Sequence, residues 1–223
     1  MSFETAWFIA QTLAKGAVVT LEITVLAALL ALPLGFAVAL LRVSPWRVTR
    51  LLSTVYVEFL RGTSALVQLF YLFFVFPPLF GVVLSPMETG VIGLGVNFSA
   101  YASEIIRSAL INIDRGQRDA VLALDFPPME AFRRVLLPQV MPLMLPPLGI
   151  LLIELLKSTS LVYTITLMDL TFAGHNIITS VGYQTTTWTV VLLCYFMLAW
   201  PLSRMVKRYE RHLTRHRTAR GQA

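Results

Sequence analysis

The sequence predicts an all-α, polytopic membrane protein with about five transmembrane helices and a structured cytoplasmic loop. Of its 223 residues, 57% are hydrophobic and only 13% are charged, whereas soluble domains carry about 45–50% apolar and about 25% charged residues. The mean hydropathy is +0.73. The apolar residues also occur in blocks near the roughly 20 residues that a membrane-spanning helix needs. This composition excludes a disordered chain, a disulfide-stapled secreted domain and a typical soluble enzyme.

The first three spans follow from the apolar blocks in the N-terminal half. We expect the first span over residues 16–41, with a bend at Pro33-Leu34-Gly35. A second block covers residues 51–76 and stops at Pro77-Pro78, because two prolines interrupt helical hydrogen bonding. The third block covers residues 86–113 and leads into the longest internal polar stretch of the chain.

Two more spans are expected in the C-terminal half. The polar stretch of residues 114–134 is followed by a fourth block over residues 136–165, which is rich in proline. Residues 166–187 are mixed and rich in threonine, and a fifth block covers residues 188–203. An odd number of spans places the two termini on opposite sides of the membrane.

The basic residues predict the orientation. Residues 42–50, 107–134 and 204–220 hold 15 of the 18 Lys and Arg residues, and the loops at 76–88 and 166–187 hold none. Because Lys and Arg are enriched in cytoplasmic loops, we expect these three regions inside the cell. The N-terminus is then outside and the C-terminus is cytoplasmic.

We predict a single transmembrane domain over residues 1–211, with its cytoplasmic loop at about 114–137, and a basic cytoplasmic tail over residues 212–223. The net charge of +6 and the pI near 9.8 then indicate contact with anionic membrane lipid rather than with nucleic acid. His212 and His216 in the tail have no nearby third ligand. No metal site and no cofactor are predicted.

The loop between the third and fourth spans predicts two short amphipathic helices within Gly116 to Pro138. Residues 125–128 separate the helices, because two adjacent prolines cannot both lie inside a helix, although Pro128 can open the second one. The small side chains of Ala120 and Ala123 on the first helix would allow close contact with a groove on a partner protein. A loop that merely connects two spans is the alternative.

This stretch resembles the EAA loop in the membrane subunits of bacterial ABC importers. That loop reads Glu-Ala-Ala, three residues, Gly, nine residues, Ile, one residue and Leu-Pro. Asp119-Ala120-Val121 matches the triplet, Asp125 the glycine, Val135 the isoleucine and Leu137-Pro138 the ending. Asp therefore replaces both Glu and Gly. Asp tolerates a left-handed turn better than most residues, so the break between the helices can survive without glycine.

Three other segments resemble the polar amino-acid branch of the same family. Residues 58–63 are similar to its Glu-Phe-x-Arg-Gly-Thr segment, and residues 100–107, followed by Gly116-Gln117, are similar to its third-span signature. Residues 156–161 are similar to its fourth-span segment. The resemblance covers the chain from about Thr12 to Arg211.

The resemblance implies a permease subunit with the type I ABC importer fold, in a bacterial inner membrane, that carries a polar amino acid or a related zwitterion. It implies three partners: a pair of ABC ATPase subunits, an extracytoplasmic solute-binding protein, and a second permease subunit in a homodimer or heterodimer. The loop residues that it assigns to ATPase coupling are Gly116, Asp119, Ala120, Val121, Ala123, Leu124, Asp125, Phe132, Leu137 and Pro138.

The chain is not expected to be an enzyme. It contains no G-x-x-x-x-G-K-[ST] phosphate loop, so ATP hydrolysis is expected on a separate subunit, and no catalytic residues are predicted.

Three acid–base pairs at i,i+3 lie within the spans: Glu58 with Arg61, Glu104 with Arg107, and Glu154 with Lys157. Because ionisable groups at membrane depth are costly and commonly functional, we predict that the first and third pairs line the substrate pathway. Local bracing of the fold is the alternative, and it is favoured for the middle pair.

Three other functions stay open at this point. Residues 154–160 and Asp169-Leu170-Thr171-Phe172 also resemble permeases for ectoine-type compatible solutes. A secondary transporter or channel that works without an ATPase would commonly show internal repeats, and no convincing repeat is present. An integral-membrane enzyme would need a polar cluster at one face, but histidine occurs only at positions 175, 212 and 216.

Overall fold

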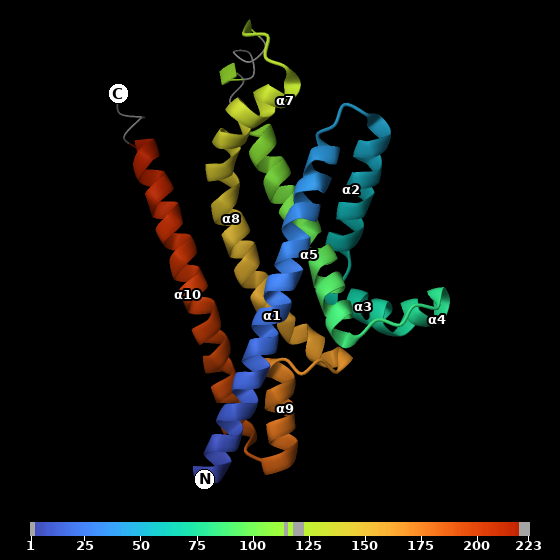
Figure 1. The fold of residues 1–223 in the computed structure, drawn as a ribbon, viewed down its shortest axis with the longest axis vertical. Coiled ribbons are helices and arrows are strands. Elements are labelled where there is room, and N and C mark those ends of the chain that lie inside the picture. Colours follow the sequence, from blue (N-terminus) through green and yellow to red (C-terminus); the bar gives the residue numbers. More distant parts are fainter. Residues whose placement is uncertain (1–2, 114–115, 118–122, 219–223) are drawn as a thin grey trace.

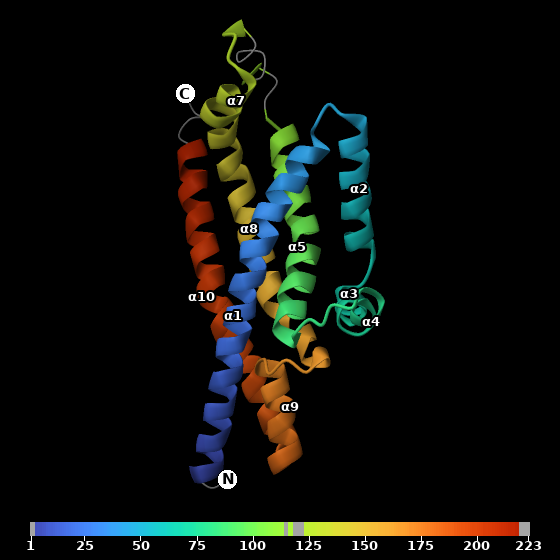
Figure 2. The same cartoon turned by 45° about the vertical axis from the view of Figure 1, so that its right-hand side comes forward.

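The computed structural model describes residues 3–113, 116–117 and 123–218, and every regular element in these ranges is helical. The all-α prediction is confirmed. Helix α1 (Phe3–Arg42) runs along the long axis of the molecule, and α5 (Pro86–Ile111), α8 (Leu137–Ser158) and α10 (Gln184–Thr218) run beside it (Figures 1 and 2). The N-terminus lies at one end of the bundle, and the loop before α8 lies at the other, near the C-terminal end of α10.

Among the described residues, three helical stretches are long and apolar enough to cross a membrane: Glu4–Arg42, Ala131–Ile165 and Gln184–Arg211. A bent pair of helices would make a fourth. Helix α5, the expected third span, is not one of them, because glycine, serine and asparagine lower its mean hydropathy. Its small and polar side chains are buried against α1, α2 (Arg47–Gly62) and α8. Since protein and not lipid surrounds it, α5 needs no continuous apolar surface.

The prediction of one continuous second span is wrong. Helix α2 ends at Gly62, and the chain turns by 103° before α3 (Ala65–Phe70) begins. Helix α3 continues through the π-helical turn η1 (Tyr71–Val75) into α4 (Phe76–Phe80), and this arm lies across the bundle axis (Figure 1). The predicted stop at Pro77-Pro78 is also wrong, because both prolines lie within α4, which ends at Phe80.

Two side-chain amides cap the broken end of α2. Gln68 Nε2 donates hydrogen bonds to the Leu60 carbonyl at 3.0 Å and to Thr63 Oγ1 at 2.7 Å. Asn97 Nδ2 on α5 donates to the same carbonyl at 3.2 Å and to Gln68 Oε1 at 3.0 Å. Within a bilayer, irregular backbone is tolerated only where protein or water satisfies its polar groups. This amide pair therefore stabilises the turn.

The remaining boundaries also differ from the predicted blocks. Helix α1 begins at Phe3 rather than near residue 16, and it remains one helix through Pro33. Helix α8 ends at Ser158 and is followed by a 3₁₀ segment, η3 (Thr159–Ile165). The threonine-rich connection contains an additional helix, α9 (Leu170–Val181). Helix α10 continues without a break into the predicted tail and reaches Thr218.

Glycines allow α1 and α5 to pack closely. A Cβ atom built on Gly35 of α1 would lie 2.7 Å from the Cβ atom of Ala102 and 2.8 Å from the Ser99 carbonyl oxygen. A Cβ atom on Gly95 of α5 would lie 2.7 Å from a methyl carbon of Leu30. The interface between these two helices forms the centre of the main hydrophobic core. Gly35 and Gly95 thus permit the close contact of α1 with α5.

Asp169 anchors α9 to its neighbours. Its side chain is fully buried, and Oδ1 accepts a hydrogen bond from the Phe172 backbone N–H at 2.9 Å, which caps the helix. Tyr195 of α10 donates its hydroxyl to Oδ2 at 3.1 Å. The next residue, Leu170, donates its backbone N–H to Thr20 Oγ1 of α1 at 3.1 Å. Burial raises the pKa of the Asp169 carboxyl above its usual range.

Replacing Asp169 with alanine is expected to lower the free energy of unfolding by about 1–2 kcal/mol, because the helix cap and the bond from Tyr195 are both lost. Asp169→Asn keeps a capping oxygen and should cost less. Since the folded-state pKa is raised, the folded protein favours the neutral acid. The stability of the wild type should therefore increase, relative to Asp169→Asn, as the pH falls through that raised pKa. Thermal unfolding in detergent between about pH 4 and 7 tests this, and parallel pH curves for the two proteins would contradict it.

Candidate functional site

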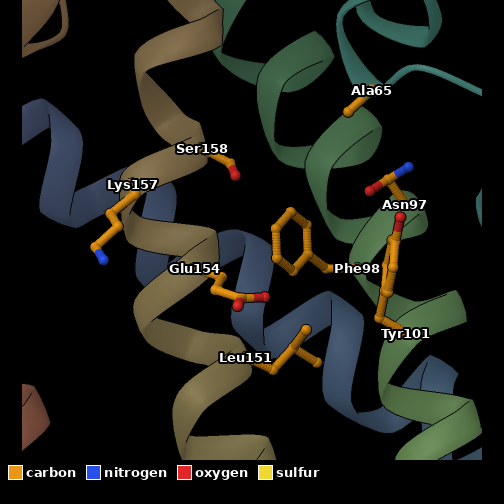
Figure 3. Close-up of a pocket in the computed structure, with 8 residues that line it drawn as sticks. All are labelled: Ala65, Asn97, Phe98, Tyr101, Leu151, Glu154, Lys157 and Ser158. Atoms are coloured by element: carbon orange, nitrogen blue, oxygen red, sulfur yellow. The ribbon is translucent and has the colours of Figure 1, made fainter.

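A pocket of about 410 Å³ lies between α5, α8 and the start of α3. It contains two of the four residues that the sequence predicts for the substrate pathway, Glu154 and Lys157. Its lining residues are Ala65, Asn97, Phe98, Tyr101, Leu151, Glu154, Lys157 and Ser158 (Figure 3). Small-molecule sites typically enclose about 300–1,000 Å³, so the pocket has room for a solute the size of an amino acid.

The two charged residues of the pocket point in different directions. The carboxylate of Glu154 is directed toward Phe98 on α5, whereas the ammonium of Lys157 extends from α8 away from α5 (Figure 3). Both side chains are exposed. No ion pair within 4.0 Å joins them in the described part of the chain, so the predicted local pairing is not formed. Glu154 therefore presents an unneutralised negative charge to the pocket.

Asn97 turns an oxygen toward the pocket. Its Nδ2 donates hydrogen bonds to the Leu60 carbonyl oxygen at the end of α2 and to Gln68 Oε1. The side-chain oxygen of Asn97 remains on the side that faces Phe98 (Figure 3). A carboxylate and an amide oxygen together suit a cationic group. The sequence reasoning missed Asn97 and Gln68, although an amide within an apolar block is itself a costly feature that needs a partner.

Arg61 belongs to a different cluster from the one predicted. Its expected partner, Glu58, is exposed and has no ion pair within the described residues. Arg61 Nη1 instead lies 3.8 Å from Glu104 Oε2, and its guanidinium lies 5.4 Å from the centre of the Tyr101 ring. Tyr101 also lines the pocket, so one aromatic ring separates Arg61 from the pocket.

Glu104 is the centre of that cluster. It accepts hydrogen bonds from Arg107 on its own helix and from Arg42 on α1, in addition to the longer contact with Arg61 of α2. The predicted i,i+3 pair between Glu104 and Arg107 is therefore confirmed. One carboxylate thus joins three helices, and the side chain of Arg42 is only 9% exposed.

The described residues of the predicted ATPase-coupling loop (116–117 and 123–137, here called the coupling loop) lie at the end of the bundle opposite the N-terminus (Figures 1 and 2). The predicted residues Asp119, Ala120 and Val121 lie outside the described residues. Gly116 and Ala123 are helical, and the helix break at residues 124–127 is confirmed. Pro128 opens a second helix as predicted: α7 (Pro128–Glu130) leads into the π-helical segment η2 (Ala131–Leu136) and then into α8, whose first two residues are Leu137 and Pro138.

The side chains of this loop divide into an exposed set and an anchored one. Leu124 and Met129 are 69% and 75% exposed. Phe132 instead packs against Phe36 of α1, with ring centres 6.5 Å apart. Phe132 therefore attaches the loop to the bundle. Leu124 and Met129 are the described apolar residues that point outward, and Met129 was not predicted.

Asp125 adopts the left-handed conformation, with φ of 50°, where the related loops have glycine. This confirms that the break survives the replacement. Asp125→Gly is expected to stabilise the protein by about 0.5–1 kcal/mol, because glycine adopts this conformation without steric cost. Chemical denaturation in detergent measures the difference. Asp125→Ala is the matched control and should destabilise, since alanine has neither the freedom of glycine nor a polar side chain that supports the turn.

The sequence matches the family model "Binding-protein-dependent transport system inner membrane component" over residues 31–215. The chain belongs to this family. The permease is 40% identical over 210 residues to a probable amino-acid ABC transporter permease protein, y4tF, of Sinorhizobium fredii, and the match covers 92% of this chain and 88% of the relative. It is 33% identical over 208 residues to the glutamine transport system permease protein GlnP of Escherichia coli, with coverage of 93% and 95%.

The fold of the permease is also found in solved structures. A crystal structure of an amino acid ABC transporter with histidines superposes on it with a TM-score of 0.88 and 29% sequence identity, and covers 95% of this chain and 99% of that one. The predicted family and its fold are therefore confirmed. The 103° turn after α2 and the additional helix α9 are parts of a fold that apolar block lengths alone do not predict.

Proposed function

We propose that this permease is the membrane-spanning subunit of an ATP-driven importer for a polar amino acid or a related zwitterionic solute. The observation that carries the substrate class is the pocket between α5 and α8, where Glu154 and the oxygen of Asn97 face a volume of about 410 Å³. The relatives named as amino-acid and glutamine permeases support the same class.

The charges around the pocket suit both ends of a zwitterion. Glu154 and Asn97 would accept the ammonium group. Arg61 is held only loosely, at 3.8 Å from Glu104, so it could contact a substrate carboxylate from beside Tyr101. Lys157 would serve the same carboxylate if its flexible stem turned inward. No described contact or pocket places Glu58 on this route, and its role remains the prediction made from the sequence.

ATP hydrolysis in this proposal occurs on a separate pair of ATPase subunits. The coupling loop would dock on them through Leu124 and Met129, which are exposed and apolar, together with Gly116 and Ala123. Phe132, packed on Phe36, would transmit movement of the loop to α1. The loop end of the bundle is then cytoplasmic and the N-terminus is outside, as the basic residues of 42–50 and 204–220 indicate. A solute-binding protein would deliver substrate at the outer face, and a second permease subunit would complete the pathway.

The test is uptake by proteoliposomes that contain the permease with its ATPase, with the solute-binding protein on the substrate side. Labelled glutamine and histidine should accumulate only with ATP. Glu154→Gln should reduce uptake at saturating binding protein by about tenfold, because the ammonium group loses its charged partner. Glu22→Gln is the matched control, since Glu22 is an exposed acid on α1 that does not line the pocket. Its uptake should equal that of the wild type.

Three results would contradict the proposal. Uptake without the ATPase would indicate a secondary transporter or channel. Transport of ectoine in preference to both amino acids would indicate a compatible-solute importer. Equal uptake by Glu154→Gln and the wild type would remove the pocket from the pathway, even if the permease still transported amino acids.

A further inference from the structure

A second pocket, of about 440 Å³, lies at the loop end of the bundle. The end of α1, the start of α2, the end of α5 and the segment η2 form its walls. It shares no lining residue with the pocket of Glu154. It is therefore a separate cavity, and its volume falls within the range of about 300–1,000 Å³ that is typical of small-ligand sites.

The lining of this pocket combines positive charge with an apolar wall. Arg42, Arg50 and Arg107 contribute the charge, and none of the lining residues is acidic. The other side chains are apolar, and Leu110 and Phe132 are among them. A ligand that matches both parts carries a negative group on a hydrocarbon body.

Among the described residues, the positive charge is only partly neutralised. Arg42 and Arg107 share the single carboxylate of Glu104. Arg107 Nε is buried and has no hydrogen-bond partner within the described residues. Arg50 is exposed and has no ion pair in the described ranges. Because a buried donor without an acceptor is costly, an anionic oxygen in this pocket would satisfy a group that the described residues leave unpaired.

We propose that this pocket binds an anionic phospholipid, with its phosphate near Arg50 and Arg107 and the beginning of an acyl chain along the apolar wall. In the proposed orientation this end of the bundle lies at the cytoplasmic leaflet, where anionic lipids concentrate. A free phosphate ion would use the arginines but would gain nothing from the apolar wall. The lipid is therefore the ligand that the whole lining favours.

The pocket also connects the lipid to the coupling loop. Phe132 and Leu136 of η2 form part of its wall, and Phe132 is the residue that attaches the loop to α1. A bound lipid would therefore touch the segment that moves when the ATPases close. Lipid composition would then influence coupling in addition to supporting the fold.

Lipid titration of the purified full-length permease, followed by native mass spectrometry, tests the proposal. Phosphatidylglycerol should bind about tenfold more tightly than phosphatidylcholine. Arg50→Gln should weaken phosphatidylglycerol binding by about fivefold, as expected for one charge contact with an anionic lipid. Arg47→Gln is the matched control, because Arg47 is exposed in the same turn of α2 but does not line the pocket.

A second variant tests the apolar wall without a change of charge. Val43 lines the pocket and is 43% exposed, so Val43→Trp should fill the cavity without unfolding the bundle and should also reduce phosphatidylglycerol binding. Unchanged phosphatidylglycerol binding by Arg50→Gln would overturn the proposal. Equal loss of binding in Arg47→Gln and Arg50→Gln would also overturn it, because it would show general attraction of the lipid to the basic surface. Displacement of the lipid by an equimolar amount of inorganic phosphate would instead show a site for a free anion and would contradict the proposal.

Discussion

Glu104→Gln is expected to lower the free energy of unfolding by about 3 kcal/mol, because it removes the carboxylate that three arginines share. The loss falls mainly on Arg42, whose side chain is only 9% exposed and would remain charged without a counter-charge. Arg107 is 28% exposed and regains part of its solvation from water. Denaturant titration of the protein in detergent, monitored by circular dichroism, measures the change.

Two further variants separate a charge effect from a general loss of packing. Glu58→Gln, which changes the same residue type at an exposed position without an ion pair in the described residues, should stay within about 0.5 kcal/mol of the wild type. The double variant Arg42→Gln with Glu104→Gln should recover part of the lost stability, because the unpaired buried charge is gone. Equal denaturation midpoints for Glu104→Gln and Glu58→Gln would show that the cluster does not stabilise the bundle.

Gly35→Leu is expected to cost about 3 kcal/mol, at the upper end for overpacking, because it drives α1 away from α5. Two of the atoms that a new Cβ would meet belong to the α5 backbone: the Ser99 carbonyl oxygen at 2.8 Å and the Ser103 nitrogen at 3.2 Å. A backbone atom cannot move aside as a flexible side chain can. The whole helix must shift, and contacts along the main core loosen with it.

Gly62→Leu is the matched control, because nothing lies within 4 Å of a Cβ at that position. Its thermal midpoint in detergent should stay close to that of the wild type, whereas Gly35→Leu should unfold many degrees earlier. If both variants unfold together, close contact between α1 and α5 is not what limits stability. Gly35→Ala should fall between the wild type and Gly35→Leu.

The sequence predicts this protein best where one residue type has one physical meaning. Pro128 opens a helix as expected. Asp125 replaces a glycine and still adopts the left-handed turn. Spacing of three on one helix correctly places Arg107 beside Glu104. Each of these inferences depends on local geometry and holds where no distant partner competes, whereas the same spacing does not pair Glu58 with Arg61.

The sequence fails where a distant residue decides the outcome. The apolar block at 51–76 predicts one continuous span. The turn inside it depends on the hydrogen bond between Gln68 and Asn97, which forms only when α5 folds against this segment. Arg61 pairs with Glu104 rather than with Glu58, since α2 packs beside α5. These features require the tertiary structure.

Helix α1 has 40 residues, which at 1.5 Å per residue is about 60 Å, twice the thickness of the hydrocarbon core of a bilayer. The N-terminal half of α1 packs with α9 and α10 in a second hydrophobic cluster that includes Ile9, Leu13 and Ile177. The C-terminal end of α1 contains Phe36, which packs against Phe132 of the coupling loop, and Arg42, which pairs with Glu104. If such a helix moved as a rigid rod, a tilt of about 5° about its loop end would displace the opposite end by about 5 Å. A small rotation beside the coupling loop would then become a large displacement at the far surface of the molecule.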